Sequence, residues 1–421
     1  MNNRGHIASL ILALCIGFSL NAQPLREYSL VSLMDGTIIL DSDTGYHQLP
    51  YWGFGIDQAV PFLTLPGPTI YANEGDSVHI DFFNPSMEGH TIHLHGLDVD
   101  MENDGVPHTS GFVQENESFK YRFKATHAGN FLYHCHVTTV MHLALGMYGM
   151  VIVYPTDSSK RIYNAGPTYD RQYECLFSEM DARWNRDYTA IGGFLSYAPD
   201  LFLINGKNRS LIYNDTSLIA TGDVGDTLLF RMMNVGYRIN RVIFPAELAS
   251  MVHTSDGRVL DTPYAADTLI LYPGERYSVL SEVLSDAASS IRVDYLDPYR
   301  LAHLGTEYIP VNDSNFQYTP PVIAEDTTDT MGVGFDEIEN PVQYTSVYPN
   351  PAADEAYVTS PLVPITQVDV VDYSGRWITS VRMQPANTVG LNTSEWQSGL
   401  YLVRIQLENG HLETSRLMVR D

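Results

Sequence analysis

An eleven-residue segment occurs twice in this chain of 421 residues, and this repeat constrains the fold more than any other feature. Residues 74–84 read EGDSVHIDFFN and residues 224–234 read VGDTLLFRMMN, with Gly, Asp and Asn at the same spacing. Around both copies, short β-rich runs are broken by Gly and Pro, and few periodic segments are long enough for a helix. The sequence therefore predicts an all-β fold with two tandem β-sandwiches.

The N-terminal residues are typical of a secretory signal peptide over residues 1–22. Arg4 precedes an apolar run over residues 7–20, and Ala22 stands at a plausible cleavage point. No later apolar stretch reaches the roughly 20 residues that a membrane-spanning helix needs. We therefore expect a soluble, exported protein.

The charge balance excludes one class of partner. The chain has 50 Asp and Glu against 24 Lys and Arg, a net charge of -26. A polyanion would be repelled by such a surface, so nucleic acid is excluded as a ligand.

A change of composition marks the C-terminal part of the chain. Residues 321–343 hold acids, Thr and Gly but no Lys or Arg, as expected of a solvated linker. Short alternating runs follow, and the turn at Asn409 and Gly410 between two of them is a strong hairpin signal. The sequence predicts a small third β-sandwich here.

This tail resembles the C-terminal sorting domain of the type IX secretion system of Bacteroidetes. The matching segments are VYPNPA at 347–352, DVVDYSGR at 369–376 and GLYLVR at 399–404. The resemblance implies that the type IX secretion machinery is a partner and that the protein is secreted or held at the cell surface. An ordinary β-sandwich module, for example for adhesion, is the alternative.

Histidines are unevenly placed, since eight of the 14 lie between His90 and His142. They cluster in two segments, HTIHLHG at 90–96 and YHCH at 133–136. Successive strand residues point to opposite faces, so two separate sets of metal ligands are expected. One face would carry His90, Cys135, His142 and Met147. Two imidazoles, a thiolate and a weak axial thioether are the ligands of a type 1, or blue, copper site.

The opposite face would carry four imidazoles, which suit further copper ions. These are His93, His95, His134 and His136. Because Cys135 lies between two of them, an electron would have a short covalent path between the two sites. Cys175 has no such neighbours and is expected to be a buried strand residue.

Here the sequence resembles the multicopper oxidases over about residues 28–285. The matching motifs are GPTI at 67–70, EGD at 74–76, DGVP at 104–107, GNFLYH at 129–134, LING at 203–206, SDG at 255–257 and PGERY at 273–277. The resemblance implies two cupredoxin-like Greek-key sandwiches, the first binding copper and the second without copper motifs. It assigns type 1 roles to His90, Cys135, His142 and Met147, the type 2 role to His93, and type 3 roles to His95, His134 and His136. Asp104 would be the acid that helps deliver protons to oxygen.

The predicted segments are the signal peptide at 1–22, a copper-binding cupredoxin domain at 23–156, a second cupredoxin-like domain at 157–320, the acidic linker at 321–343 and the sorting domain at 344–421.

Three features depart from the family pattern. His142 follows Cys135 by seven residues instead of five, and the blue-copper motif lies in the first domain instead of the last. A trinuclear cluster also takes eight histidines from two domains, whereas the second domain here has only His253 and His303. A complete cluster would therefore need another subunit, which predicts a homo-oligomer.

Three functions fit these observations. The leading one is an exported copper oxidase that takes electrons from a small reducing substrate or an electron-donor protein and passes them to oxygen. A second resembles the two-domain copper nitrite reductases, with His253 or His303 completing the second site. The third is a non-enzymatic surface cupredoxin that carries electrons or binds copper.

Overall fold

The computed structural model describes residues 24–42, 45–57, 61–191, 196–313, 345–348, 352–360, 363–372, 377–408 and 412–420. The chain divides into two compact units between Ile323 and Ala324. The predicted signal peptide and linker lie outside the described residues, so they stay predictions, as do the predicted domain boundaries. Among the helices that the structure describes, none is both long and apolar enough to cross a membrane.

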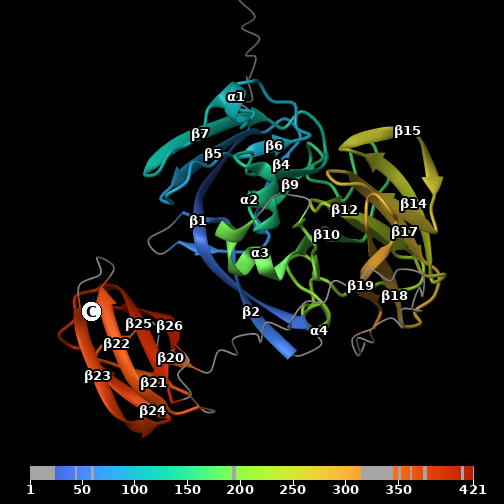
Figure 1. Cartoon of the computed structure of the whole chain (residues 1–421). Coiled ribbons are helices and arrows are strands. Elements are labelled where there is room, and N and C mark those ends of the chain that lie inside the picture. Colours follow the sequence, from blue (N-terminus) through green and yellow to red (C-terminus); the bar gives the residue numbers. More distant parts are fainter. Residues whose placement is uncertain are drawn as a thin grey trace, which may run out of the picture. The chain divides into compact units, whose positions relative to one another are not determined.

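The first unit opens with a sandwich of two sheets (Figure 1). One sheet has the strand order β3-β2-β1-β5-β7, formed by Phe62–Leu63, Gly45–Ile56, Leu25–Ser42, Ser77–Asn84 and Glu117–Lys124. The other has the order β4-β9-β8-β6, formed by Gly67–Asn73, Tyr148–Tyr154, Gly129–His134 and His93–His95. Two short helices, α1 (Pro107–Ser110) and α2 (Thr139–Ala144), interrupt the connections. Buried residues alternate along β5, as expected where one face of a strand covers the core.

The second sandwich belongs to the same compact unit. Its larger sheet has the order β11-β10-β12-β17-β14-β15, formed by Leu201–Ile204, Arg171–Met180, Thr227–Asn234, Arg276–Val283, Leu248–Ser255 and Arg258–Ala265. The smaller has the order β16-β13-β18-β19, formed by Thr268–Leu271, Ile239–Ile243, Ser289–Leu296 and His303–Val311. Its helices are α3 (Ala182–Arg186), η1 (Tyr188–Ala190) and α4 (Ser210–Tyr213).

The sequence repeat corresponds to a structural repeat. The two copies form β5 and β12, which pair in parallel with β1 and β10. The shared glycines, Gly75 and Gly225, have φ of 98° and 93°, a region that favours glycine. The shared asparagines, Asn84 and Asn234, each accept a hydrogen bond at 3.0 Å from the backbone N–H two residues on. The shared Gly and Asn thus form the turns before and after the strand in each copy.

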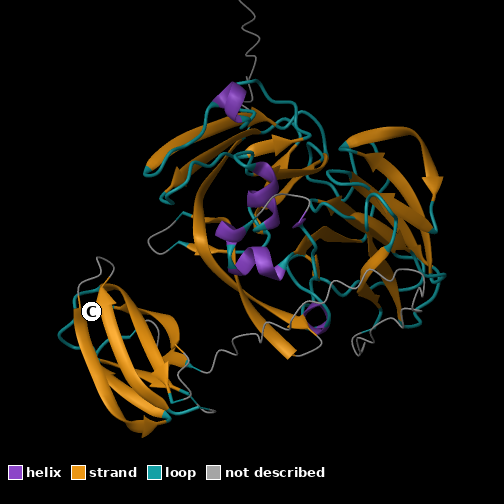
Figure 2. Cartoon of the chain, in the orientation of Figure 1, coloured by secondary structure: helices purple, strands orange, loops and turns teal. Residues whose placement is uncertain are grey.

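The second unit is a smaller sandwich. Its sheets have the orders β20-β21-β24 and β23-β22-β25-β26, formed by Ser346–Tyr348, Glu355–Thr359, Thr388–Asn392, Trp377–Ala386, Ile365–Asp372, Gly399–Leu407 and Leu412–Val419. The predicted turn at residues 409 and 410 lies outside the described part of the chain, although the strands on either side pair antiparallel. Strands dominate all three sandwiches (Figure 2), which confirms the prediction of an all-β fold.

Strand β8 lies where the two sandwiches of the first unit meet, and all six of its residues are buried. Phe131 and Tyr133 belong to the core of the first sandwich. Leu132, on the other face, packs with Leu176, Met233 and other apolar residues of β9, β10 and β12. The candidate site lies at the end of this strand, which is buried on both faces.

Candidate metal centres

The pairing of β6 with β8 places three histidines together. The strands are antiparallel, with His93 opposite His134 and His95 opposite Leu132. Leu94, between the two histidines of β6, points into the core of the first sandwich, so His93 and His95 point away from it. Cys135 follows β8 directly and belongs to that same core. The alternation predicted for Cys135 and its neighbour His134 is therefore present.

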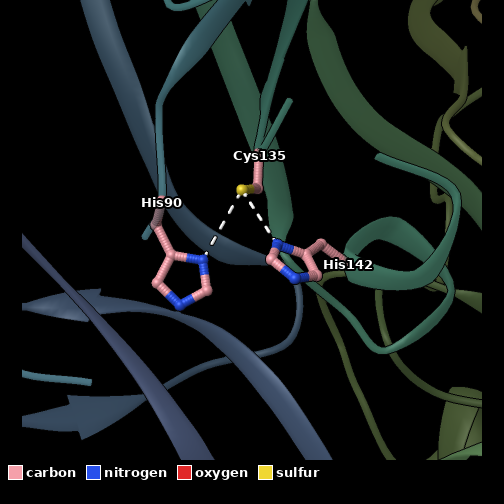
Figure 3. A group of neighbouring side chains, drawn as sticks. All are labelled: His90, Cys135 and His142. Carbon is pink, nitrogen blue, oxygen red and sulfur yellow. Dashed lines mark hydrogen bonds between the residues drawn. The ribbon is translucent and has the colours of Figure 1, made fainter. Parts of the chain in front are cut away.

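His90, Cys135 and His142 form a buried set that we call the inner group (Figure 3). The Cys135 Sγ lies 3.6 Å from Nδ1 of His90 and 3.2 Å from Nδ1 of His142. All three side chains are completely buried. His90 is not on a regular strand with His93, as the sequence predicted, but forms an isolated antiparallel bridge with Val113. The His90 ring is nevertheless buried beside Cys135.

Met147, the predicted axial ligand, is tied to this group through its backbone. Its carbonyl accepts a hydrogen bond from the Cys135 N–H at 3.1 Å, and its N–H donates to the His142 carbonyl at 3.0 Å. The side chain is fully buried in the same hydrophobic core as Cys135. His142 lies on the short helix α2, which follows Cys135 along the chain.

The charge states of the inner group suit a metal ion. Burial, with a smaller effect of His142, lowers the pKa of His90 to about 3, and burial lowers that of His142 to about 4. Both imidazoles are therefore neutral near pH 7. Burial raises the pKa of the Cys135 thiol to about 11, so a metal must displace its proton. Two imidazole nitrogens and one sulfur, buried in the same core as the Met147 thioether, are the donor set of a blue-copper site.

His93, His95 and His134 form a second set, the outer group, whose ligand atoms lie within 4.8 Å of one another. Nδ1 of His95 is 3.3 Å from Nε2 of His134. Burial lowers the pKa of His134 to about 3 and of His95 to about 4, so these rings are neutral as well. His136 stands beside this group without joining it. Its ring centroid is 5.1 Å from that of His93 and 5.9 Å from that of His134.

The tautomers of two outer histidines follow from their backbone partners. Nδ1 of His93 is 2.7 Å from the Asp104 carbonyl, and Nδ1 of His134 is 3.1 Å from the Cys135 carbonyl. A carbonyl only accepts, so both Nδ1 atoms carry the hydrogen and both Nε2 lone pairs are available to a metal. The Asp104 carboxylate is 3.4 Å from the same His93 nitrogen and is partly exposed. Its role as a proton-delivering acid stays a prediction.

Histidines of the second sandwich lie outside both groups. His303 contacts Thr306 Oγ1 at 2.8 Å and Asp294 at 3.6 Å. His253 has its buried Nδ1 without a hydrogen-bond partner. Within the described residues, the side chains of the outer group therefore come from the first sandwich alone.

Two residues at these sites were not predicted from the sequence. Glu88 lies two positions before His90, and its carboxylate accepts a hydrogen bond of 3.2 Å from Nε2 of His142. Arg276 is buried, and a Cβ on Gly96 would lie 2.2 Å from its guanidinium. After burial, this cation is the largest cause of the lowered pKa of His95. The PGERY motif was the available signal for Arg276, but its spacing does not reveal a contact across the two sandwiches.

Comparison with protein families is consistent with these two sandwiches and the tail. Two models described as multicopper oxidase match residues 63–158 and 170–292, just over half of the chain together. A model described as a secretion system C-terminal sorting domain matches residues 346–420. The tail therefore directs the protein, through type IX secretion, to the cell surface or beyond it.

Individual relatives cover part of the chain. Laccase-15 of Oryza sativa subsp. japonica is 31% identical over 242 residues, which are 54% of this chain and 38% of that protein. L-ascorbate oxidase of Cucumis sativus is 26% identical over 304 residues, 61% of this chain and 49% of that protein. The chain thus spans less than half the length of either relative.

Solved structures share the fold. The blue copper oxidase of Nitrosomonas europaea has a TM-score of 0.55 at 25% identity and covers 68% of this chain and 85% of its own. Copper nitrite reductase of the same organism has a TM-score of 0.54 at 22% identity over 68% and 93% of the two chains, a likeness of fold only. With both of its larger sandwiches matched, this chain belongs to the multicopper oxidase family.

Proposed function

We propose that this protein is an exported copper oxidase that takes single electrons from a reducing donor at the inner group and passes them to the outer group. One observation carries the proposal. Cys135 contributes its sulfur to the inner group, while the preceding residue, His134, belongs to the outer group. The ligands proposed for each site are those predicted from the sequence: His90, Cys135, His142 and Met147 for type 1 copper, and His93, His95, His134 and His136 for type 2 or type 3 copper. Copper supplies the redox change between its Cu(II) and Cu(I) states.

Glu88 is the proposed point at which electrons enter, and Cys135 the proposed path between the two groups. His142 is buried, but its Nε2 contacts the Glu88 carboxylate, which is 39% exposed. A donor that reaches Glu88 is therefore separated from the inner group by one hydrogen bond and one ring. From the Cys135 sulfur, covalent bonds lead through one peptide unit to the His134 side chain. The acidic chain attracts cationic donors by long-range steering.

Oxygen is the proposed acceptor. Four one-electron oxidations of the donor reduce one O₂, with four protons, to two waters. Asp104 is the proposed acid for these protons, because its carboxylate lies at the edge of the outer group beside His93. Because the second sandwich offers no histidine to this group among the described residues, the missing ligands are proposed to come from another copy of the chain. Two first sandwiches facing each other would pool their four histidines each, which gives an even-numbered homo-oligomer.

The test is to load the purified full chain with Cu²⁺ and measure copper per chain, oligomer mass, visible absorption and oxygen uptake with a one-electron donor. Cys135→Ser is expected to abolish the blue absorption and oxygen uptake. His134→Ala combined with His136→Ala is expected to keep the blue absorption and lose oxygen uptake. A stable monomer that binds one copper and consumes no oxygen would refute the proposal.

The same samples separate the other two functions. Nitrite turnover that is lost in His253→Ala or His303→Ala would indicate a nitrite reductase. The fold that this chain shares with copper nitrite reductase is the observation in favour of that function. Against it, the His303 ring already contacts Thr306 and Asp294. Retention of all activity in the His134 and His136 variants would indicate a simple electron carrier or a copper-binding protein.

A further inference from the structure

The segment between Cys135 and His142 holds a strained residue. Thr138, just before α2, has φ of 42° and ψ of 48°, in the left-handed region. For a β-branched residue this conformation is unfavourable, and it persists only where surrounding contacts hold it. Thr138 also accepts the backbone hydrogen bonds of Met141 and His142, at 2.9 and 3.2 Å. The strain is therefore part of the turn that places His142.

A tyrosine of the second sandwich holds this turn. The Tyr237 hydroxyl lies 3.3 Å from the Thr139 carbonyl and 3.2 Å from the Val140 carbonyl, and donates its hydrogen to this pair. Tyr237 comes from the connection between β12 and β13, nearly one hundred residues away in sequence. It thus fixes the two residues that directly follow the strained Thr138.

Tyr237 is itself fixed by a buried acid. Its backbone N–H donates to Oε1 of Glu179 at 2.6 Å, and Glu179 is 3% exposed. Its ring stands edge-on to Tyr197, whose hydroxyl donates to the Glu179 carbonyl at 3.0 Å. The residue whose hydroxyl contacts α2 is therefore held by buried contacts within the second sandwich.

The same sandwich also packs against the other parts of this segment. Ala144 at the end of α2 shares an apolar cluster with Trp184 and Tyr197. Tyr188 stands edge-on to Trp52, with ring centroids 4.8 Å apart, and Trp52 stands edge-on to His142 at 5.3 Å. Polar and apolar contacts thus reach the His142 segment from the second sandwich.

We infer that Tyr237 is a positioning residue for the inner group, and that the second sandwich, which supplies no ligand to either group among the described residues, serves to hold the ligand His142 in place. The inference rests on the proposed function, because it assigns the inner group as a copper site. It gives the second sandwich a role in this site that the ligand set alone does not show.

The experiment uses Tyr237→Phe in the full chain, which keeps the ring and removes only the hydroxyl. The first readout needs no copper: the rate at which iodoacetamide alkylates Cys135 in the metal-free protein, followed by peptide mass spectrometry. Loss of about one hydrogen bond should make local opening, and hence alkylation, about fivefold more frequent. The second readout is the blue absorption of the copper-loaded protein, which should shift because it depends on ligand geometry.

The matched control is Tyr264→Phe, a change of an exposed tyrosine of β15 in the same sandwich. It should leave both readouts at wild-type values, and the melting temperature of both variants should stay close to that of the wild type. An unchanged alkylation rate in Tyr237→Phe, or an equal increase in Tyr264→Phe, would overturn the inference. A wild-type protein without blue absorption would instead refute the proposed function, while the alkylation rate still tests the role of Tyr237.

Discussion

Replacing Asn130 with alanine should weaken the contact between the two sandwiches of the first unit and so lower the free energy of unfolding. Asn130 lies in β8 and is completely buried. Its amide donates to the carbonyls of Met232 and Tyr277 at 3.4 and 3.3 Å, and its Oδ1 accepts from the Ser278 hydroxyl at 2.7 Å. All three partners belong to the second sandwich.

The expected loss follows from these distances. The two amide contacts are longer than the usual 2.7 to 3.2 Å range, and each contributes little, roughly 0.5 kcal/mol. The Ser278 bond is well formed, and alanine would leave that hydroxyl buried without a partner, at a cost of about 1 to 3 kcal/mol. Asn130→Ala should therefore lower the free energy of unfolding by about 2 to 4 kcal/mol. Asn130→Asp should lower it further near pH 7, because a buried charge would face two carbonyls.

Urea denaturation followed by circular dichroism measures this loss. Asn164→Ala is the control, since Asn164 is exposed and bonds only to Thr156 nearby, so its effect should stay within about 0.5 kcal/mol. Asn130→Ala within that same limit would show that the two sandwiches do not depend on this side chain. If Asn130→Ala lowers the free energy of unfolding but leaves its slope against urea concentration unchanged, this would support unfolding of the two sandwiches as a single cooperative unit.

Two further predictions concern acidic residues. Asp104→Asn should leave the blue absorption unchanged, because the backbone carbonyl of residue 104 still holds His93. Oxygen uptake should slow about a hundredfold if the Asp104 carboxylate delivers protons. An unchanged rate in steady-state oxygen measurements would show that Asp104 does not have that role. Burial raises the pKa of Glu179 from 4.5 to about 7. The folded chain therefore keeps the Glu179 proton up to about pH 7, whereas the unfolded chain loses it near pH 4.5. The stabilisation that comes from protonated Glu179 is complete below pH 4.5 and is lost as the pH rises to 7. In Glu179→Gln, the urea concentration at the unfolding midpoint should change less between pH 4.5 and 7 than in the wild type. The same pH dependence in both proteins would contradict a raised pKa of Glu179.

Local pattern was sufficient to predict which of the candidate ligand side chains lie together. The two-residue period of a strand separates Cys135 from His134, and the structure places them on opposite faces because β8 continues to His134. His136 lies beyond the end of β8, and its ring stands beside those of His93 and His134 but outside the outer group. Strand alternation predicted that His90 lies on the same side as Cys135, and it does, but an isolated bridge with Val113 orients it instead of a regular strand.

Contacts between distant segments were beyond the reach of sequence pattern. Glu88, Tyr237 and Arg276 have no motif that ties them to a ligand, and each acts through a contact that only the folded chain creates. Helix α2, which carries His142, was equally hidden. The spacing of seven residues signals a reshaped connection, but neither the helix nor its partner can be read from it.

The second sandwich also decides the surroundings of the outer group. A strand of an antiparallel sandwich normally has one face in the core and one in water, which would leave Asn130, Leu132 and His134 hydrated. In this chain all of β8 is buried, because Leu132 packs against β10 and β12 and Asn130 bonds to β12 and β17. Burial is the main cause of the low pKa of His134, about 3, and hence of its neutral ring. The second sandwich, which offers no histidine to either group among the described residues, thus keeps the His134 ring buried and neutral.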